Sequence, residues 1–329
     1  MLQYVIRRLT LFVPTLLVVS MVVFVIIQLP PGDYLTTYIT NLALQGQQMH
    51  EDAIETLKRQ YGLDQPMYIQ YIRWLWKMLH GDFGMSLEYN RPVSSLLWER
   101  LLLTVVLSAS TIIFVWSLAI PIGIYSATHQ YTIFDYLLTF FSFIGVATPE
   151  FMLALVLMWV AFSSFGWSVG GLFSRDFVEA PWSLARVWDL IKHLWIPMII
   201  LGASGTAGLV RTVRANMLDE LRKPYVVTAR AKGLPESRII WKYPVRVALN
   251  PFISTVGWAL PALISGSTIV SVVLSLPTTG PLLLRSLLNQ DMFLAGSFLM
   301  MLSSLTILGT LISDILLAWL DPRIRLGDR

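Results

Sequence analysis

The stretch Lys223-Pro-Tyr-Val-Val-Thr-Ala-Arg-Ala-Lys-Gly-Leu-Pro-Glu-Ser-Arg238 is a polar island between long apolar runs, and the organisation of the chain follows from it. Pro224 suits the first turn of a helix, where its missing N–H would be unpaired in any case. Gly233 followed by Pro235 predicts the end of that helix, because glycine accepts a left-handed cap and proline cannot continue the helix. A helix of about 13 Å is marginal alone in water. We therefore expect it to pack against another element.

The side chains of this short helix allow two interpretations. Tyr225 and Ala229 fall on one face, at positions i and i+4. Arg230 and Lys232 flank that stripe. A basic amphipathic helix of this kind can rest on lipid headgroups, and a short helix can equally enter a groove on a cytoplasmic partner. The stretch alone does not decide between them.

The composition is typical of a membrane protein. Of the 329 residues, 55% are hydrophobic and 13% are charged. The apolar residues come in long runs rather than in half-faced helices or strands, which indicates membrane spans. The net charge is +4, and basic clusters in a membrane protein report orientation before they suggest nucleic acid. The chain has no cysteine, which excludes disulfides, cysteine-based zinc sites and cysteine nucleophiles.

Six apolar segments predict six transmembrane helices in an all-α membrane protein. They are residues 9–29, 101–128, 136–165, 194–210, 252–274 and 292–320. The third is interrupted by Thr148-Pro149-Glu150. Arg7 and Arg8, together with the strongly basic loop over residues 211–246, place the N-terminus and this loop in the cytoplasm. With six spans, the C-terminus returns to the same side.

Four parts follow from this topology. They are an N-terminal tail with the first span (1–30), an external helical segment (31–99), a transmembrane core (100–320) with a cytoplasmic loop (211–250), and a cytoplasmic tail (321–329). The external segment holds eight of the chain's 20 acidic residues. Its Trp74 and Trp76 suit either a membrane interface or a small packed core.

Motifs for nucleotide hydrolysis and metal catalysis are absent from the sequence. No phosphate loop, His-Glu-x-x-His or Gly-x-Ser-x-Gly motif occurs. The four histidines, at positions 50, 80, 129 and 193, match no metal spacing. We therefore expect a chain that is not an enzyme and binds no metal or cofactor itself. A membrane-embedded hydrolase is the weakest alternative, because no serine is singled out.

Polar groups inside the predicted spans are candidates for a translocation path. Glu150 is the clearest, because a charge in hydrocarbon is costly unless it is paired or hydrated. It either lines the path or fixes the helix break as a hydrogen-bonded carboxyl. Ser265, Thr268 and Ser271 lie in the predicted fifth span and either face water or bond back to their own helix.

Three stretches carry a resemblance to a known family. Residues 225–234, Arg246-Val-Ala-Leu-Asn-Pro251 and Asp321-Pro-Arg-Ile-Arg325 closely resemble the permeases of binding-protein-dependent ABC importers of the dipeptide/oligopeptide (peptide/nickel) family. The run Thr228 to Gly233 matches the dipeptide type fully. The resemblance implies the type I importer fold, a multi-pass protein of the bacterial inner (cytoplasmic) membrane surrounded by lipid.

This resemblance assigns roles to residues and partners. It implies an "EAA" coupling helix that sits in a cleft of an ATPase subunit, formed by Tyr225, Val226, Thr228, Ala229, Arg230, Ala231, Lys232, Gly233 and Leu234. The implied partners are a second permease, two ABC ATPase subunits that use ATP and Mg, and an extracytoplasmic solute-binding protein, with no nucleic acid. The loop Pro277, Thr278, Thr279 and Gly280 departs from the family's Pro-Gly-Leu-Gly turn and is expected to face the binding protein.

The function predicted from the sequence is the permease subunit of an ATP-driven importer of di- or oligopeptides. The same machinery could import oligosaccharides or nickel instead. An ion-coupled secondary carrier is the alternative from another class, and it would work without ATPase subunits and depend on Glu150.

Overall fold

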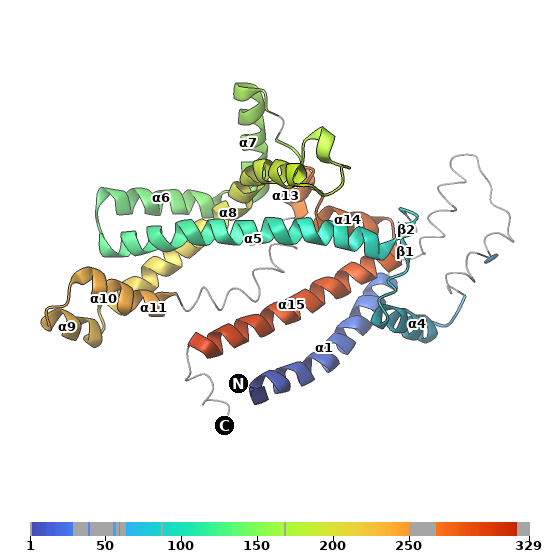
Figure 1. Ribbon diagram of the computed structural model, residues 1–329, viewed down its shortest axis with the longest axis horizontal. Coiled ribbons are helices and arrows are strands. Elements are labelled where there is room, and N and C mark those ends of the chain that lie inside the picture. The colour runs from blue at the N-terminus through green and yellow to red at the C-terminus, as the bar shows by residue number, and fades with distance from the viewer. Residues whose placement is uncertain are drawn as a thin grey trace. The chain divides into compact units, whose positions relative to one another are not determined.

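The computed structural model shows a protein built almost wholly of helices (Figure 1). It describes residues 2–28, 39, 55–56, 59, 64–86, 88–167, 169–249 and 268–320. Among these residues the strands are confined to one short antiparallel hairpin, which pairs Met85–Ser86 (β1) with Arg91–Pro92 (β2). The prediction of a mostly helical chain is therefore confirmed.

Two compact units make up the chain, and each is described by itself. The first comprises Met1–Leu103 with Thr278–Leu308. The second comprises Thr104–Pro277 with Gly309–Arg329. The long helices α5 (Val93–Thr128) and α15 (Met292–Leu320) contribute residues to both units.

The first unit holds α1 (Leu2–Gln28), α4 (Met67–Leu79) and α14 (Thr279–Leu288), with residues 93–103 of α5 and 292–308 of α15. Helix α4 lies against the C-terminal part of α1. The hydroxyls of Ser20 and Tyr71 are 2.8 Å apart, and the Gln28 side-chain amide donates to Gln70 at 3.1 Å. These side-chain contacts fix the amphipathic helix at the end of the first apolar segment.

The core of the first unit joins the start of α5 to the start of α15. Val93, Leu96 and Leu97 follow the i, i+3, i+4 spacing of one helix face. They are buried against Leu294 and Phe298. This packing holds both long helices together at the ends that belong to this unit.

A buried carboxylate also links two elements of the first unit. Asp291 accepts a hydrogen bond from the Leu294 N–H at 3.2 Å and so caps the start of α15. Its other oxygen accepts a hydrogen bond from the Ser86 hydroxyl at 2.6 Å. The cap therefore ties the β1–β2 hairpin to α15.

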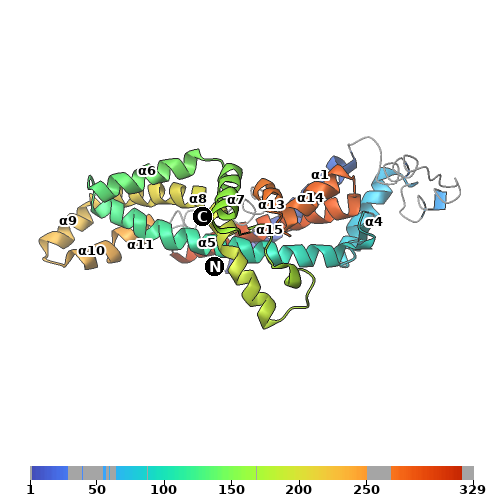
Figure 2. The ribbon, with the colours of Figure 1, turned by 90° about the horizontal axis from the view of Figure 1, so that it is seen from above.

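The second unit is built around three long helical segments: α5, α6 (Ile133–Ala147) and α8 (Leu184–Leu221). After a tight turn α6 runs back in the direction opposite to α5 (Figure 1), and Figure 2 shows α8 between the two. Helix α8 packs against α6 along its length and against the end of α5 through Ile124 and Ala127. Gly123 permits the close approach of α5 to α8, because a Cβ there would lie 2.6 Å from the Val213 Cβ. The short 3-10 turn η1 (Arg175–Phe177) and α13 (Thr268–Val273) complete this part of the unit.

The predicted break in the third apolar segment is confirmed. Helix α6 ends at Ala147, and α7 (Glu150–Phe165) begins two residues after Thr148, which is the C-cap of α6. The two helices are bent by 103° relative to one another. Pro149 lacks an N–H and disfavours helical geometry at the preceding residue, which explains the corner.

Four helices are long and apolar enough to cross a membrane. They are Thr10–Gln28, Val93–Thr128, Leu184–Leu221 and Met292–Ile312. The bent α6–α7 pair raises the number of candidate spans among the described residues to five. The predicted span over residues 252–274 lies mostly outside the described residues, as does the tail 321–329.

Helix α8 corrects the predicted boundaries of the fourth segment. The sequence predicts a span over residues 194–210 and a loop from Arg211 onward. The observed helix instead has 38 residues and runs from Leu184 to Leu221. The apolar run ends at charged residues, but the helix continues through them. Arg186 and Asp189, for example, are held inside by hydrogen bonds to neighbouring loop atoms.

After α8 the chain forms three short helices that we call the lobe. They are α9 (Pro224–Ala231), α10 (Glu236–Lys242) and α11 (Pro244–Ala248). Both views place the lobe at the end of α8, beside the turn that joins α5 to α6 (Figures 1 and 2).

Candidate functional site

Helix α9 has the capping that its sequence predicts. Pro224 stands at its first position. At the other end Gly233 has φ = +73°, a left-handed conformation that glycine adopts freely because it has no Cβ. The Gly233 N–H donates to the Arg230 carbonyl at 2.9 Å. The next N–H, that of Leu234, donates to the Ala229 carbonyl at 3.3 Å. Together these bonds form a Schellman motif, so the predicted helix and its end are confirmed.

One face of α9 is buried within the lobe. Val226 is fully buried, Ala229 is 5% exposed, and both pack against Ile239 of α10. Leu234 extends this apolar cluster beyond the cap. The packing face is therefore Val226 with Ala229, at i and i+3. Tyr225, at i and i+4 with Ala229, is 38% exposed and lies at the edge of this face, with its ring centre 5.9 Å from that of Tyr243.

The other face of α9 is exposed. Its members are Pro224, Val227, Thr228, Arg230 and Ala231, followed by Lys232 at the C-cap. This face combines an apolar side chain with a hydroxyl and two cations. Such a mixture suits a groove on a partner protein that offers both apolar surface and oxygen acceptors.

Two polar contacts hold α9 in place from the sides. The Arg230 guanidinium donates to the Glu236 carboxylate at 3.0 Å, and this hydrogen bond lowers the pKa of Glu236. The Tyr225 hydroxyl donates to the Glu220 carboxylate at the end of α8. Burial, and then this hydrogen bond, raise the pKa of Tyr225 to about 12. Tyr225 is therefore a neutral donor at physiological pH.

The lobe is attached to the long helices through α11. Val245 and Ala248 pack in one buried cluster with Ile124 of α5 and with Val213 and Met217 of α8. Because buried side chains are close-packed, a displacement of α11 acts directly on both helices.

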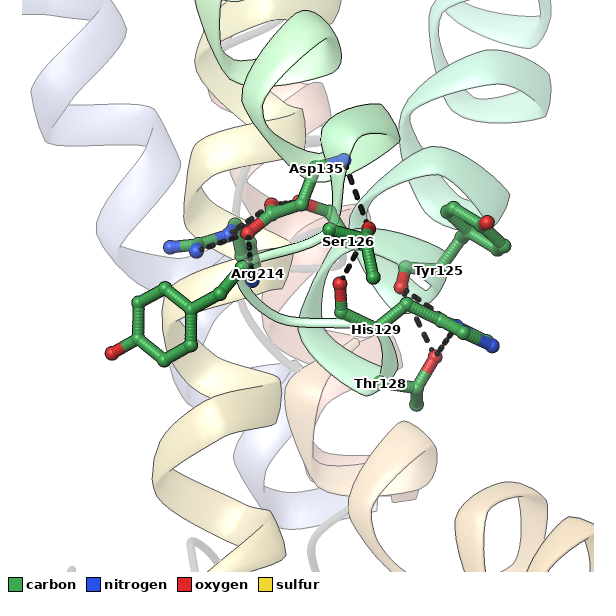
Figure 3. A network of polar contacts seen from close by, with 8 residues as sticks. Tyr125, Ser126, Thr128, His129, Asp135 and Arg214 are labelled. Atoms are coloured by element: carbon green, nitrogen blue, oxygen red, sulfur yellow. Dashed lines mark hydrogen bonds and ion pairs between the residues drawn. The ribbon is translucent and has the colours of Figure 1, made fainter.

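An ion pair between α6 and α8 involves Arg214, the residue that follows Val213 of this cluster (Figure 3). Asp135 of α6 is 2% exposed. Arg214 of α8 donates to it twice, from Nε to Oδ1 at 3.0 Å and from Nη2 to Oδ2 at 2.9 Å. The Ser126 hydroxyl of α5 and the Tyr131 backbone N–H also donate to this carboxylate. The acceptor sites of Asp135 are thus filled from three directions, and we call this contact of α5, α6 and α8 the joint.

The local sequence places Asp135 in the joint. Thr132 is the N-cap of α6, and its hydroxyl accepts a hydrogen bond from the Asp135 N–H at 3.3 Å. A carboxylate in the first helical turn is favoured by the unpaired N–H groups and the dipole there. Asp135 therefore both starts α6 and binds α8.

Two family models match the chain. One, described as "Binding-protein-dependent transport system inner membrane component", matches residues 119–326. Its N-terminal companion, "Binding-prot-dependent transport system membrane comp, N-term", matches residues 1–108. The chain belongs to this family. The permease is thus an inner membrane component of a binding-protein-dependent importer, a translocation subunit and not an enzyme.

Relatives of the permease match it from end to end. The oligopeptide transport system permease protein AppB of Bacillus subtilis is 38% identical over 325 residues, which cover 98% of this chain and 99% of the relative. The dipeptide transport system permease protein DppB of Alkalihalophilus pseudofirmus is 32% identical over 339 residues, with 99% and 100% covered. The glutathione transport system permease protein GsiC of Salmonella paratyphi A is 31% identical over 325 residues, with 99% of each chain covered.

The residues predicted to line the translocation path lie in different settings in the permease. Glu150 is the first residue of α7 and is half-buried at the α6–α7 corner. Ser271 is fully buried in α13, and its hydroxyl has no hydrogen-bond partner among the described residues. Thr268 is half-buried at the start of α13, and Ser265 lies outside the described residues. Their role in the path stays a prediction.

The segment expected to face the binding protein is largely covered within the permease. Thr278 is 3% and Thr279 is 1% exposed, Gly280 is buried, and Pro277 is half-buried. Thr279 is the first residue of α14. The expected contact with a binding protein stays a prediction, and in the structure these residues are packed.

The joint of the permease was missed by sequence reasoning. The apolar pattern places Asp135 in the short connection between two predicted spans and Arg214 in the basic loop. The pattern Thr132-x-x-Asp135 is a helix-start signal that could have placed the carboxylate on α6. No sequence signal names Arg214 as its partner, because the two residues are far apart in the chain.

Proposed function

We propose that this permease passes di- or oligopeptides across the membrane as one of two permease subunits, driven by two ABC ATPase subunits and supplied by an extracytoplasmic binding protein. The observation that carries the proposal is α9. It is a rigidly capped helix with one face anchored to the spans through the lobe and the other face exposed.

Charge supports the orientation. The lobe and the end of α8 are rich in arginine and lysine, and such clusters mark the cytoplasmic side. Arg7 and Arg8 put the N-terminus on that side as well. With a further span over residues 252–274, the proposal is six spans with both termini in the cytoplasm.

In the proposed mechanism the exposed face of α9 sits in a cleft of the ATPase subunit. ATP binding closes the ATPase pair and displaces α9. The displacement passes through the Val226–Ile239 cluster to α10 and α11, and from there to α5 and α8. The ATPases bind one orientation of the lobe more tightly than the other, and this differential binding shifts the permease between inward-open and outward-open states.

The peptide cargo rests on the names of the relatives. The relatives are named for oligopeptide, dipeptide and glutathione transport, and each matches the chain over nearly its whole length. The binding protein is the component to test, since it selects the cargo. We expect its thermal unfolding temperature to rise with short peptides and not with oligosaccharides or nickel. A rise with sugar or nickel alone would overturn the peptide assignment.

The path proposal includes Glu150 and the buried Ser271, whose hydroxyl is available for a hydrogen bond. Glu150→Gln also separates this mechanism from an ion-coupled carrier. We expect the variant to keep ATP-driven uptake in the assembled complex. An ion-coupled carrier would lose uptake in this variant and would transport without ATPase subunits.

The test of the whole proposal uses the absence of cysteine in the natural chain. Thr228→Cys and Ala231→Cys lie on the exposed face of α9, and Ala229→Cys, at 5% exposure, is the matched control on the buried face. In the assembled transporter we expect the first two to crosslink to the ATPase subunit and the control not to. A complex that transports while neither exposed position crosslinks would contradict the docking role of α9.

A further inference from the structure

Helix α6 is attached to α8 at both of its ends. At its start, Asp135 binds Arg214 in the joint, with two hydrogen bonds that fix both the distance and the plane of the guanidinium (Figure 3). Near its other end, Gly145 rests on α8. A Cβ on Gly145 would lie 3.1 Å from the Ala207 Cβ and 3.4 Å from the Ala203 carbonyl oxygen. The small residues here interlock the two helices.

These two attachments oppose sliding of α6 along α8. A shift of one residue is about 1.5 Å along a helix, which would take the paired atoms of Asp135 and Arg214 out of bonding range. Asp135 is buried, so a shift would leave a carboxylate without water to replace its partners. Arg211 adds a third link, with its guanidinium 5.5 Å from the centre of the Phe143 ring of α6.

The same α8 carries the lobe. Met217 and Val213 of α8 share a buried cluster with Val245 and Ala248 of α11, and Ile124 of α5 completes it. Ser126, two residues further along α5, donates to Asp135. The apolar cluster and the polar joint are therefore adjacent, and each includes both α5 and α8.

We propose that Asp135, Arg214 and Ser126 are positioning residues for transport, which lock α5, α6 and α8 to the lobe so that all four move as one rigid body. The inference rests on the proposed function, because the ATPases supply the movement. In this inference the joint transmits movement, so that α6 moves as far as the lobe does when α9 is displaced. The relative movements of the transport cycle then occur between this rigid body and the rest of the transporter.

A covalent link between α6 and α8 tests the inference directly. Gly145→Cys with Ala207→Cys places two Cβ atoms close to the separation that a disulfide needs, in a chain without other cysteines. If α6 and α8 move together, the oxidised double variant in the complete transporter should take up peptide within about twofold of its reduced form. Gly145→Cys and Ala207→Cys alone, treated with the same oxidant, are the controls. Loss of uptake on oxidation, recovered by reduction, would overturn the inference.

The positioning role of the ion pair has its own readout. Asp135→Asn removes the charge and keeps the shape, so α6 should lose its register on α8. We expect ATP hydrolysis by the complex to persist while uptake falls at least tenfold. The Gly145–Ala207 disulfide, introduced into Asp135→Asn, should restore uptake to within a few-fold of the unmodified complex. If the ion pair only stabilises the fold, ATP hydrolysis, uptake and protein yield should fall together in Asp135→Asn. In that case the disulfide should not restore the ratio of uptake to hydrolysis.

These experiments separate failure of the inference from failure of the proposed function. If the unmodified complex shows no ATP-driven uptake, the proposed function is wrong. If it transports and the cross-linked form does not, only the rigid-body inference is wrong. Should Asp135→Asn fail to accumulate, the disulfide in the unmodified background still decides the point. The disulfide should also form at equal rates in nucleotide-free and vanadate-trapped complexes, and unequal rates would contradict a rigid body.

Discussion

Two ion pairs in this permease have the same chemistry and opposite surroundings. Arg214 and Asp135 meet in the joint, where the aspartate side chain is 2% exposed. Arg230 and Glu236 meet in the lobe, where the side chains are 46% and 52% exposed. Water solvates the second pair whether or not it forms, whereas the first carboxylate has exchanged all its water for protein donors. The joint is therefore built for fixed geometry, and the exposed face of the lobe for contact with another protein.

The largest effect that would test this contrast is expected at Asp135. Asp135→Ala leaves the Arg214 guanidinium without its partner and removes the acceptor of the Tyr131 N–H just before α6. We expect a loss of about 3 kcal/mol in the free energy of unfolding, the lower end of the range for broken buried pairs, because Arg214 is 27% exposed. Denaturant unfolding of the purified permease in detergent measures it. If Glu236→Ala lowers the free energy of unfolding by as much as Asp135→Ala does, the proposed difference between the two ion pairs is wrong.

The second largest effect on the free energy of unfolding is expected where α5 packs against α8. Gly123→Ala would place a Cβ 2.6 Å from the Val213 Cβ and 3.1 Å from the Val210 carbonyl oxygen. We expect a cost of about 1–3 kcal/mol from overpacking, measured by the same unfolding assay.

Gly208→Ala is the matched control for Gly123→Ala. A Cβ at Gly208 meets nothing within 4 Å, so this variant should be neutral or stabilised by up to about 1 kcal/mol, since alanine favours the helix. Equal effects at the two glycines would show that α5 and α8 are not in close contact.

In the lobe we expect function to respond more than stability. Gly233 has φ = +73° with nothing within 4 Å of a built Cβ, so a substitution meets backbone strain but no crowding. Gly233→Val should cost about 1–2 kcal/mol locally and unwind the end of α9, leaving membrane insertion intact while uncoupling ATP hydrolysis from uptake. Gly233→Asn, which tolerates this conformation, should retain most uptake. Normal uptake by Gly233→Val would refute the role of the cap.

The smallest effect is expected for the exposed pair. Arg230→Gln should change the free energy of unfolding by less than about 1 kcal/mol, and high salt should reduce the difference further. The pKa of Glu236 is lowered below its ordinary value of 4.5 by the hydrogen bond from Arg230. The stabilisation is therefore complete above pH 4.5 and is lost as the pH falls through the lowered pKa. Unfolding of the variant and the unmodified permease at pH 7 and at successively lower pH measures it, and a difference that does not shrink as the pH falls would contradict the assignment.

Local chemistry and long-range packing were not equally predictable from sequence. Pro224 and Gly233 determine α9 by backbone preferences that need no knowledge of neighbours, and the helix lies where they indicate. Pro149 likewise predicted the break between α6 and α7, although not the 103° angle, which depends on what each half packs against. The permease family could also be recognised from the sequence, because a short run of residues is typical of it.

Contacts between residues far apart in the chain could not be predicted from the sequence. Whether Tyr225 or Val226 faces the lobe interior depends on where α10 lies, and no pattern within α9 specifies that. The sequence predicts too short an α8, because charges at the edge of an apolar run are typical of a loop, although a helix continues through charges that are solvated or paired. Asp135 and Arg214 are partners only because α6 and α8 are adjacent in space.

The corner at Pro149 has a consequence for how the chain fits its bilayer. A continuous helix over residues 133–165 would be about 50 Å long, against a hydrocarbon thickness of about 30 Å. Such an excess would force strong tilting or a local thickening of the lipid, the penalty known as hydrophobic mismatch. The 103° bend shortens the distance between the two ends of this stretch, so one proline reduces the mismatch that a straight helix of the same length would meet.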